Sequence, residues 1–286
     1  MQIIKETDQI TNMSIKWAVE NKSIGLVPTM GALHEGHLSL VNESKRNNDA
    51  TIVSIYVNPK QFGPNEDLSK YPRDLEGDIA KLEAAGVDCV FLPSDEIMYQ
   101  AGYCTNISVE GLNKKLCGFY RPSHFDGVAT VVAKLFNICR PTNAYFGQKD
   151  YQQTLIIKRF VKDLNMNVNI IICPIIREPS GLALSSRNAY LSPEEKKAAT
   201  IIFKALSFGD YQLKKGEQDI SLIKHEMQAM IKEEPLITEI QYCSIYDTET
   251  LEEIEQINTS ALLAIALKIG NTRLIDNMLF YKEKLG

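Results

Sequence analysis

Short apolar runs alternate with stretches of helical period through the first two thirds of the chain. The apolar runs are rich in β-branched residues and predict strands at 23–28, 50–57, 88–92, 144–146 and 168–173. The stretches between them predict helices at 36–47, 75–85, 128–140 and 151–164. Buried strands that alternate with helices are typical of a parallel sheet covered by helices on both faces. We therefore predict an α/β fold with a Rossmann-like, doubly wound parallel sheet.

The pattern changes after about residue 176. Ser192 followed by Pro193 is a favourable start for a helix over 193–211, and a second helix is expected over 220–232. Strand-like runs without long helices between them follow at 240–246, 261–268 and 273–279. We expect two domains, residues 1–176 with the parallel sheet and residues 177–286 as a smaller α+β lid. Chemistry is expected in the loops that follow the parallel strands, because ligands of such sheets bind beyond the strands' carboxyl ends.

Composition narrows the class of protein. The chain has 286 residues, of which 44% are hydrophobic and 23% charged, which is ordinary globular usage. Its formal charge of -5 argues against a general nucleic-acid binder, and no apolar run approaches the roughly 18 residues of a membrane span. The first residues show no signal-peptide pattern, and the six cysteines are scattered without a C-x-x-C pair. These features predict an enzyme with reduced thiols in the cytoplasm.

The loop after the first long strand carries His34 and His37, with Gly36 between them. If a helix begins near Gly36, both imidazoles lie at its N-terminus, where free N–H groups and partial positive charge favour an anion. Imidazole can donate a hydrogen bond to a phosphate oxygen and can carry charge, and Gly36 would let a base or ribose approach the backbone. A metal site and ordinary capping are the alternatives. The position directly after a buried strand favours the nucleotide.

Six segments, in this order along the chain, resemble the motifs of one family. His34-Glu35-Gly36-His37 is similar to the HIGH signature of nucleotidyltransferases, and the longer string 28–37 resembles the pantoate–β-alanine ligase family. The family's other motifs are matched by 56–67 with Tyr71-Pro72-Arg73, then by 121–128, 145–153, 185–188 and 273–277. Two departures are small: Leu184 stands where the family has methionine, and Ser180 stands where it has aspartate.

The resemblance implies ATP-dependent condensation of pantoate with β-alanine through pantoyl adenylate, releasing AMP and pyrophosphate. The catalytic residues it implies are His34, His37, Lys149, Ser185, Ser186 and Arg187, with His37 as proton donor. The ATP site it implies comprises Met30, Gly31, His34, Gly36, His37, Gly147, Lys149, Asp150, Ile176, Leu184, Ser185, Ser186 and Arg187. The pantoate site it implies comprises Gln61 and Gln153, with Pro28, Met30, Asn58, Phe62 and Tyr71 around them.

Each of these side chains suits its expected part. Lys149 would place a point charge at the β- and γ-phosphates, and Asp150 could hold the ribose hydroxyls and cap the next helix. The hydroxyls and guanidinium of Ser185–Arg187 would reach the triphosphate from the second domain, so that closure excludes water. An amide such as Gln61 both donates and accepts, as pantoate's hydroxyl and carboxylate groups require.

Several points stay open at this stage. Mg²⁺ is expected to arrive with ATP; Asp74, Glu76 and Asp78 are candidate ligands, and no metal-binding residue is assigned. The segment 62–71 is expected to be a mobile flap or a subunit contact, and Arg121 and His124 either face the pocket or form a structural turn. The resemblance implies a homodimer. The rival functions are another HIGH-motif nucleotidyltransferase with a phosphorylated substrate and a nucleotide sensor without turnover.

Overall fold

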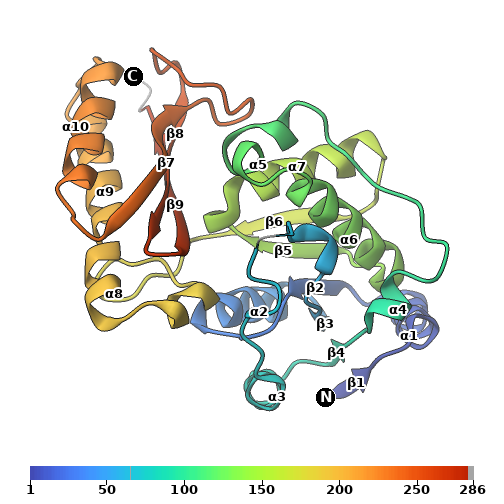
Figure 1. Ribbon diagram of the computed structural model, residues 1–286. Coiled ribbons are helices and arrows are strands. Elements are labelled where there is room, and N and C mark those ends of the chain that lie inside the picture. Colours follow the sequence, from blue (N-terminus) through green and yellow to red (C-terminus); the bar gives the residue numbers. More distant parts are fainter. Residues whose placement is uncertain (65, 283–286) are drawn as a thin grey trace.

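A six-stranded parallel sheet forms the first part of the protein, in a computed structural model that describes residues 1–64 and 66–282 (Figure 1). The strand order is β1-β4-β3-β2-β5-β6. The strands are β1 (Gln2–Ile4), β2 (Ile24–Thr29), β3 (Ala50–Ile55), β4 (Cys89–Phe91), β5 (Asn143–Gly147) and β6 (Asn169–Cys173). This confirms the predicted α/β class, and the five expected strands are β2 to β6. The short edge strand β1, which pairs with β4, was not predicted.

Helices cover both faces of this sheet. One face packs against α1 (Thr7–Val19), α6 (His124–Cys139) and α7 (Tyr151–Asp163), and the other against α2 (Glu35–Asn47) and α3 (Leu75–Ala84). Leu26 and Ile52 enter the first core while Val27 and Val53 enter the second, because successive strand residues point to opposite faces. Both faces being buried explains why the strands are apolar throughout. The helix α1 was not predicted.

Short elements join these parts. They are η1 (Pro59–Gln61), α4 (Asp95–Met98), η2 (Leu112–Lys114), α5 (Leu116–Tyr120), η3 (Gln148–Asp150) and η4 (Ser186–Tyr190). The helix expected at 128–140 begins four residues earlier as α6, after Ser123 in a left-handed conformation with φ 68°. His124 therefore lies in the first turn of a helix.

The second part holds a three-stranded antiparallel sheet of order β7-β8-β9, formed by β7 (Ile237–Tyr246), β8 (Ser260–Ile269) and β9 (Thr272–Tyr281). The helices α8 (Pro193–Ala199), α9 (Ile201–Lys214) and α10 (Ile220–Lys232) pack on it. The single helix expected over 193–211 is interrupted at Thr200, whose hydroxyl donates to the Lys197 carbonyl. The proposed domain boundary near residue 176 lies between β6 and this unit, and residues 283–286 of the expected second domain lie outside the described residues.

The topology reverses between β2 and β5, which are neighbours in the sheet. From β2 the chain continues to β3 and β4 on one side, and from β5 it continues to β6 on the other. The loops after β2 and β5 therefore leave in opposite directions and open a crevice at their carboxyl ends. The candidate site lies there. Among the described residues, no helix is both long and apolar enough to cross a membrane.

Candidate active site

The loop after β2 organises its own end. His34 is the N-cap of α2, and its Nδ1 accepts a hydrogen bond from the Gly36 N–H at 3.1 Å. In return, Nδ1 of His37 accepts from the His34 N–H at 3.3 Å, which closes a reciprocal capping box. Because each Nδ1 accepts, each neutral ring carries its proton on Nε2. The expected placement of both imidazoles at a helix N-terminus is confirmed, and each can donate one further hydrogen bond.

Both imidazoles are neutral near pH 7. Burial, and then the nearby Lys149, lowers the pKa of His34 to about 4. Burial, followed by the neighbouring His34 and Lys149, lowers the pKa of His37 to about 3. In the protein without nucleotide the two rings therefore act as N–H donors, and the fixed positive charge near them comes from Lys149 and from Lys81, whose ammonium donates to the Leu33 carbonyl at 2.8 Å. A bound polyanion would raise both pKa values, because an opposite charge favours the protonated ring.

Asp78 shapes the first half of the same loop. Its carboxylate accepts from the Ala32 N–H at 2.8 Å and from the Leu33 N–H at 2.7 Å, and the side chain is buried. Gly31 makes the turn with φ +83°, where a side chain would meet the Asp78 carboxylate. Gly31 thus shapes the loop and, unlike every other residue expected at the site, does not line the cavity described below.

Two of the three candidate Mg²⁺ ligands, Asp74 and Asp78, accept hydrogen bonds from the backbone. Both carboxylate oxygens of Asp78 are occupied by backbone N–H groups, and Asp74 caps α3 through the Gly77 N–H at 3.0 Å. Glu76 is exposed in the first turn of that helix. Within residues 1–64 and 66–282 no group of three or more His, Cys, Asp or Glu side chains could hold a metal ion. Asp74 and Asp78 thus have structural contacts, and the protein ligand of Mg²⁺ stays unassigned.

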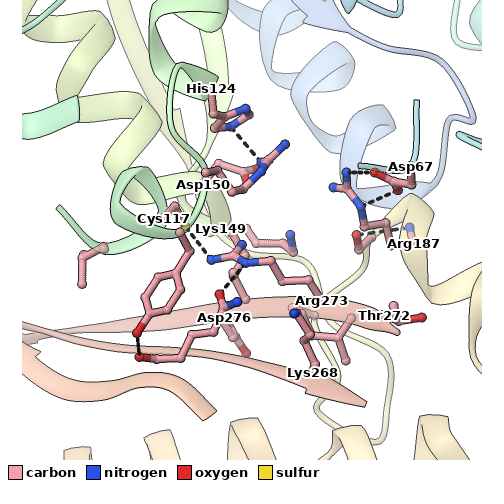
Figure 2. Close-up of a pocket in the computed structure, with 18 of the residues that line it drawn as sticks. Asp67, Cys117, His124, Lys149, Asp150, Arg187, Lys268, Thr272, Arg273 and Asp276 are labelled. Carbon is pink, nitrogen blue, oxygen red and sulfur yellow. Dashed lines mark hydrogen bonds and ion pairs between the residues drawn. The ribbon is translucent and has the colours of Figure 1, made fainter. Parts of the chain in front are cut away.

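A cavity of about 240 Å³ lies at the carboxyl ends of β2, β3 and β5. With the exception of Gly31, all the residues expected from the sequence line it: Pro28, Met30, His34, Gly36, His37, Asn58, Gln61, Phe62, Tyr71, Gly147, Lys149, Asp150, Gln153, Ile176, Leu184, Ser185, Ser186 and Arg187. A larger cleft of about 1210 Å³ lies between the two sheets and shares Lys149, Asp150, Gln153, Ser185 and Arg187 with the cavity. Figure 2 shows Lys149 and Asp150 across this cleft from Arg273 and Thr272. The residues are thus brought together, and their individual roles stay predictions.

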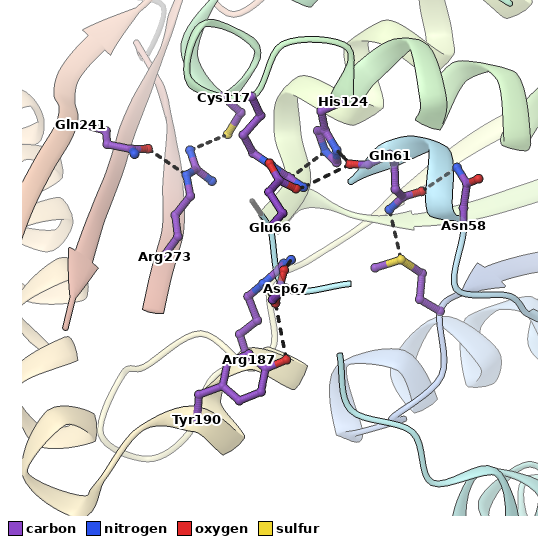
Figure 3. A network of polar contacts seen from close by, with 12 residues as sticks. Asn58, Gln61, Glu66, Asp67, Cys117, His124, Arg187, Tyr190, Gln241 and Arg273 are labelled. Carbon is purple, nitrogen blue, oxygen red and sulfur yellow. Dashed lines mark hydrogen bonds and ion pairs between the residues drawn. The ribbon is translucent and has the colours of Figure 1, made fainter. Parts of the chain in front are cut away.

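The amide of Gln61 is held from several sides. Its Oε1 accepts from Asn58 Nδ2 at 3.1 Å, and its Nε2 lies 3.0 Å from the Met30 sulfur (Figure 3). Asn58 is itself buried and also donates to the Gly127 carbonyl at 3.1 Å. A Cβ on Gly127 would lie 2.3 Å from the Lys60 carbonyl oxygen, so the turn η1 and α6 approach at a distance that only glycine permits. This packing places Gln61 at the cavity wall.

Arg121 and His124 face the cavity, which answers the question left open by the sequence. An arginine can only donate, so His124 Nε2 accepts from Arg121 Nη1 at 3.0 Å, and His124 Nδ1–H donates to the Gln61 carbonyl at 2.8 Å. Burial, and then the Arg121 charge, lowers the pKa of His124 to about 3. Arg121 also grips both carboxylate oxygens of Glu66, at 2.8 and 2.6 Å.

Arg187 comes from the second part of the chain and forms an ion pair with Asp67, the residue after Glu66. Its guanidinium makes two hydrogen bonds of 2.9 Å to the carboxylate of Asp67 (Figure 2). Ser185 accepts from the Arg187 N–H at 3.3 Å, and the Ser186 hydroxyl donates to the Ala32 carbonyl at 3.3 Å. The acidic pair Glu66-Asp67 therefore holds one arginine on each side of the cavity, within a single chain.

The turn η3, between β5 and α7, carries Lys149 and corrects one expectation. Asp150 precedes α7 as its N-cap, but its side chain makes no capping hydrogen bond. Its carboxylate is exposed beside the cavity. The turn is held instead by Asn277 of β9, a contact that sequence reasoning missed because the two residues are more than a hundred positions apart.

Fold and site together define a class. The loop after β2 presents two imidazoles at a helix N-terminus. A lysine after β5 and a Ser-Ser-Arg loop from the second unit line the same cavity. This arrangement on a parallel sheet is typical of nucleotide-binding α/β enzymes of the HIGH type. The family model described as Pantoate-beta-alanine ligase matches residues 2–279. The chain belongs to this family.

Known relatives agree along the whole chain. The pantothenate synthetase of Thermodesulfovibrio yellowstonii is 54% identical over 279 residues, which cover 98% of this chain and 99% of the relative. That of Acetivibrio thermocellus is 57% identical over 256 residues, covering 90% and 91%. The crystal structure of the enzyme from Thermus thermophilus matches with a TM-score of 0.93 and 41% identity, covering 99% of this chain and 100% of that one. The Francisella tularensis ligase, in complex with β,γ-ATP and β-alanine, matches with a TM-score of 0.80 and 37% identity, covering 98% and 97%.

Proposed function

We propose that the protein condenses pantoate with β-alanine in an ATP-dependent reaction and releases pantothenate, AMP and pyrophosphate. In the first step a pantoate carboxylate oxygen attacks the α-phosphorus, and the bond to the bridging oxygen of pyrophosphate breaks. In the second step the amine of β-alanine attacks the acyl carbon, loses a proton, and AMP leaves with the electron pair of the broken C–O bond. The observation that carries this assignment is the meeting of imidazole, ammonium, hydroxyl and carboxamide groups at one cavity.

The first step brings an anion to a polyanion, so positioning and charge stabilisation should dominate. The Nε2–H groups of His34 and His37 are proposed to donate to oxygens of the α-phosphate and the departing pyrophosphate. Lys149 supplies a full positive charge from the turn after β5, and Ser185, Ser186 and Arg187 approach from the other unit. Because Arg187 is paired with Asp67 in the described structure, the nucleotide would have to replace that carboxylate.

Pantoate is proposed to bind beside Gln61 and Gln153, whose amides can both donate and accept. Pro28, Met30 and Phe62 supply an apolar wall for its branched carbon, and Tyr71 packs its ring edge-on against Phe62 with centroids 5.8 Å apart. Asn58 is proposed to orient Gln61, since its own amide is buried and fully engaged.

The source of Mg²⁺, the cellular location and the oligomeric state are further proposals. Mg²⁺ enters as part of the MgATP substrate, since the acidic residues nearest the first loop are engaged elsewhere. A cytoplasmic location is supported by six free cysteines, five of them buried. A homodimer is proposed from the family resemblance alone, and analytical ultracentrifugation measures it.

The test is pyrophosphate release with a panel of acids. Release is expected only when pantoate is present with MgATP, and AMP with pantothenate should form once β-alanine is added. Release with a phosphorylated substrate in place of pantoate would favour another nucleotidyltransferase activity. ATP binding without AMP formation when both substrates are present would favour a sensor.

A further inference from the structure

The turn that carries Lys149 is not capped by its own side chains. It begins at Gly147, which has no side chain, and neither Gly147 nor Asp150 makes a side-chain capping bond at the two element starts. A cation that must meet a phosphate oxygen needs a defined position, since misplacement of about an ångström slows the reaction strongly. A side chain from outside the turn can supply this restraint.

Asn277 of β9 supplies the missing bonds. Its Nδ2 donates to the Gln148 carbonyl at 3.0 Å and to the Lys149 carbonyl at 2.9 Å. Its Oδ1 accepts from Gln148 Nε2 at 3.2 Å. Both amide hydrogens are therefore engaged by the backbone of the turn, and the Asn277 residue is only 4% exposed. An amide in this position is built to hold the turn rather than to bind a ligand.

Asn277 is in turn fixed by its neighbour. Asp276 accepts from the Asn277 N–H at 2.8 Å and pairs with the Arg177 guanidinium through both carboxylate oxygens, one of these contacts being 3.0 Å. Arg177 also donates to the Gly181 carbonyl at 3.1 Å, in the segment that leads to Ser185. The middle of β9 thus links the Lys149 turn to the segment that leads to the Ser-Ser-Arg loop.

We infer that Asn277 is a positioning residue for Lys149, so that the phosphate-facing lysine of the first unit is held in place by the second. This inference rests on the proposed function, in which Lys149 stabilises the first step. Removing the Asn277 amide would leave two carbonyls of the turn without their donor and free the turn to move. The effect should reach catalysis only through Lys149.

A double-mutant cycle tests this route, with single-turnover formation of pantoyl adenylate as the readout. Asn277→Ala is expected to slow that step about tenfold, which corresponds to about 1.4 kcal/mol of transition-state stabilisation. The same substitution is expected to raise KM for ATP. In a Lys149→Ala background the same substitution should slow the step by less than about twofold, because the group it positions is gone. Pantothenate formation from supplied pantoyl adenylate should be spared in all variants. An equal factor in both backgrounds would overturn the inference.

Gln148→Ala is the matched control. It removes the 3.2 Å bond to Asn277 and leaves both bonds from Asn277 to the turn, so adenylate formation should stay within about twofold of wild type. Unfolding temperatures are compared for every variant, and if Asn277→Ala does not fold, Asn277→Ser, which keeps one donor, completes the cycle. A wild-type chain that releases no pantoate-dependent pyrophosphate would instead refute the proposed function, so the two failures are distinguishable.

Discussion

The turns after β2 and β5 face each other across the crevice and are held by different means. The first half of the loop after β2 is held by Asp78, but its α2 end is capped locally, since His34 accepts from the Gly36 N–H and His37 accepts from the His34 N–H. The turn after β5 is held by Asn277, which lies 128 positions beyond Lys149 in the chain. The first loop therefore owes its capping to its own sequence, while the second depends on docking of the antiparallel sheet.

The difference separates two kinds of site residue. A group placed by local hydrogen bonds forms whenever its strand and helix form, whereas a group placed by a distant partner is correct only in the assembled molecule. Arg187 and Gln61 belong to the second kind, since they are held by Asp67 and by His124. Domain movement should therefore disturb Lys149 and Arg187 and leave the imidazoles in place.

The largest expected effect is at the locally built loop. His37→Ala removes the Nε2–H that we propose donates to the α-phosphate, and should slow adenylate formation by about two orders of magnitude or more. The fold should survive, since the ring makes only one backbone contact within its own turn. Single-turnover quench experiments measure the rate, and circular dichroism checks the fold. Turnover near wild type would show that the first loop is not a catalytic element.

Next in size is the loss of the lysine from the distantly held turn. Lys149→Ala should slow the first step by about tenfold to a hundredfold, because a single charge-stabilising contact is lost. The second step, measured with supplied pantoyl adenylate, should be nearly unchanged. If both steps slow equally, Lys149 does not act on the pyrophosphate. The way in which the turn after β5 is held would then have no bearing on the first step.

A smaller effect is expected where the flap holds Arg187. Asp67→Asn removes the carboxylate that a triphosphate must displace, and KM for ATP should fall a few-fold, on the order of 1 kcal/mol. Glu66→Gln is the matched control, because it weakens the pair with Arg121 instead. Isothermal titration with a non-hydrolysable ATP analogue gives the affinity directly. A rise in the dissociation constant for Asp67→Asn would mean that the ion pair prepares Arg187 for the nucleotide.

The last prediction concerns stability against pH and leaves the catalytic rate aside. His124 has a pKa of about 3 in the folded protein and should have one of about 6.5 when unfolded. As pH falls, His124 is protonated in the unfolded chain near pH 6.5 but stays neutral in the folded protein until about pH 3. The free energy of unfolding therefore falls as pH drops below about 6.5, by at most about 1.4 kcal/mol per pH unit for this residue.

His124→Asn keeps a donor for the Gln61 carbonyl and cannot titrate. Urea unfolding of the protein without nucleotide, between about pH 6 and pH 5, should show a shallower pH dependence in this variant than in wild type. An unchanged slope would mean that His124 is already protonated in the folded protein. The residual slope belongs to His34 and His37, whose pKa values are also lowered.

Much of the fold could be predicted because its signals are local. The apolar runs indicated the strands β2 to β6, and the capping potential of Ser192-Pro193 marked the start of α8. The three-residue strand β1 was missed because so short a run has no periodicity, and the break at Thr200 was missed because its hydroxyl bond to Lys197 leaves no mark on the apolar pattern. Asp150 was expected to cap α7, but the distant amide of Asn277 holds the turn instead.

By itself the sequence determined the alternation of strands and helices, the family motifs and the placement of His34 and His37 at a helix N-terminus, since all of these depend on neighbours a few residues apart. Only the tertiary structure decided that Asp78 accepts from the backbone of the first loop, that Glu66 and Asp67 hold two arginines, and that Asn277 donates to the turn that carries Lys149. The physical reason is reach: a hydrogen bond acts over about 3 Å, and residues far apart in sequence come that close only after both sheets have folded and docked.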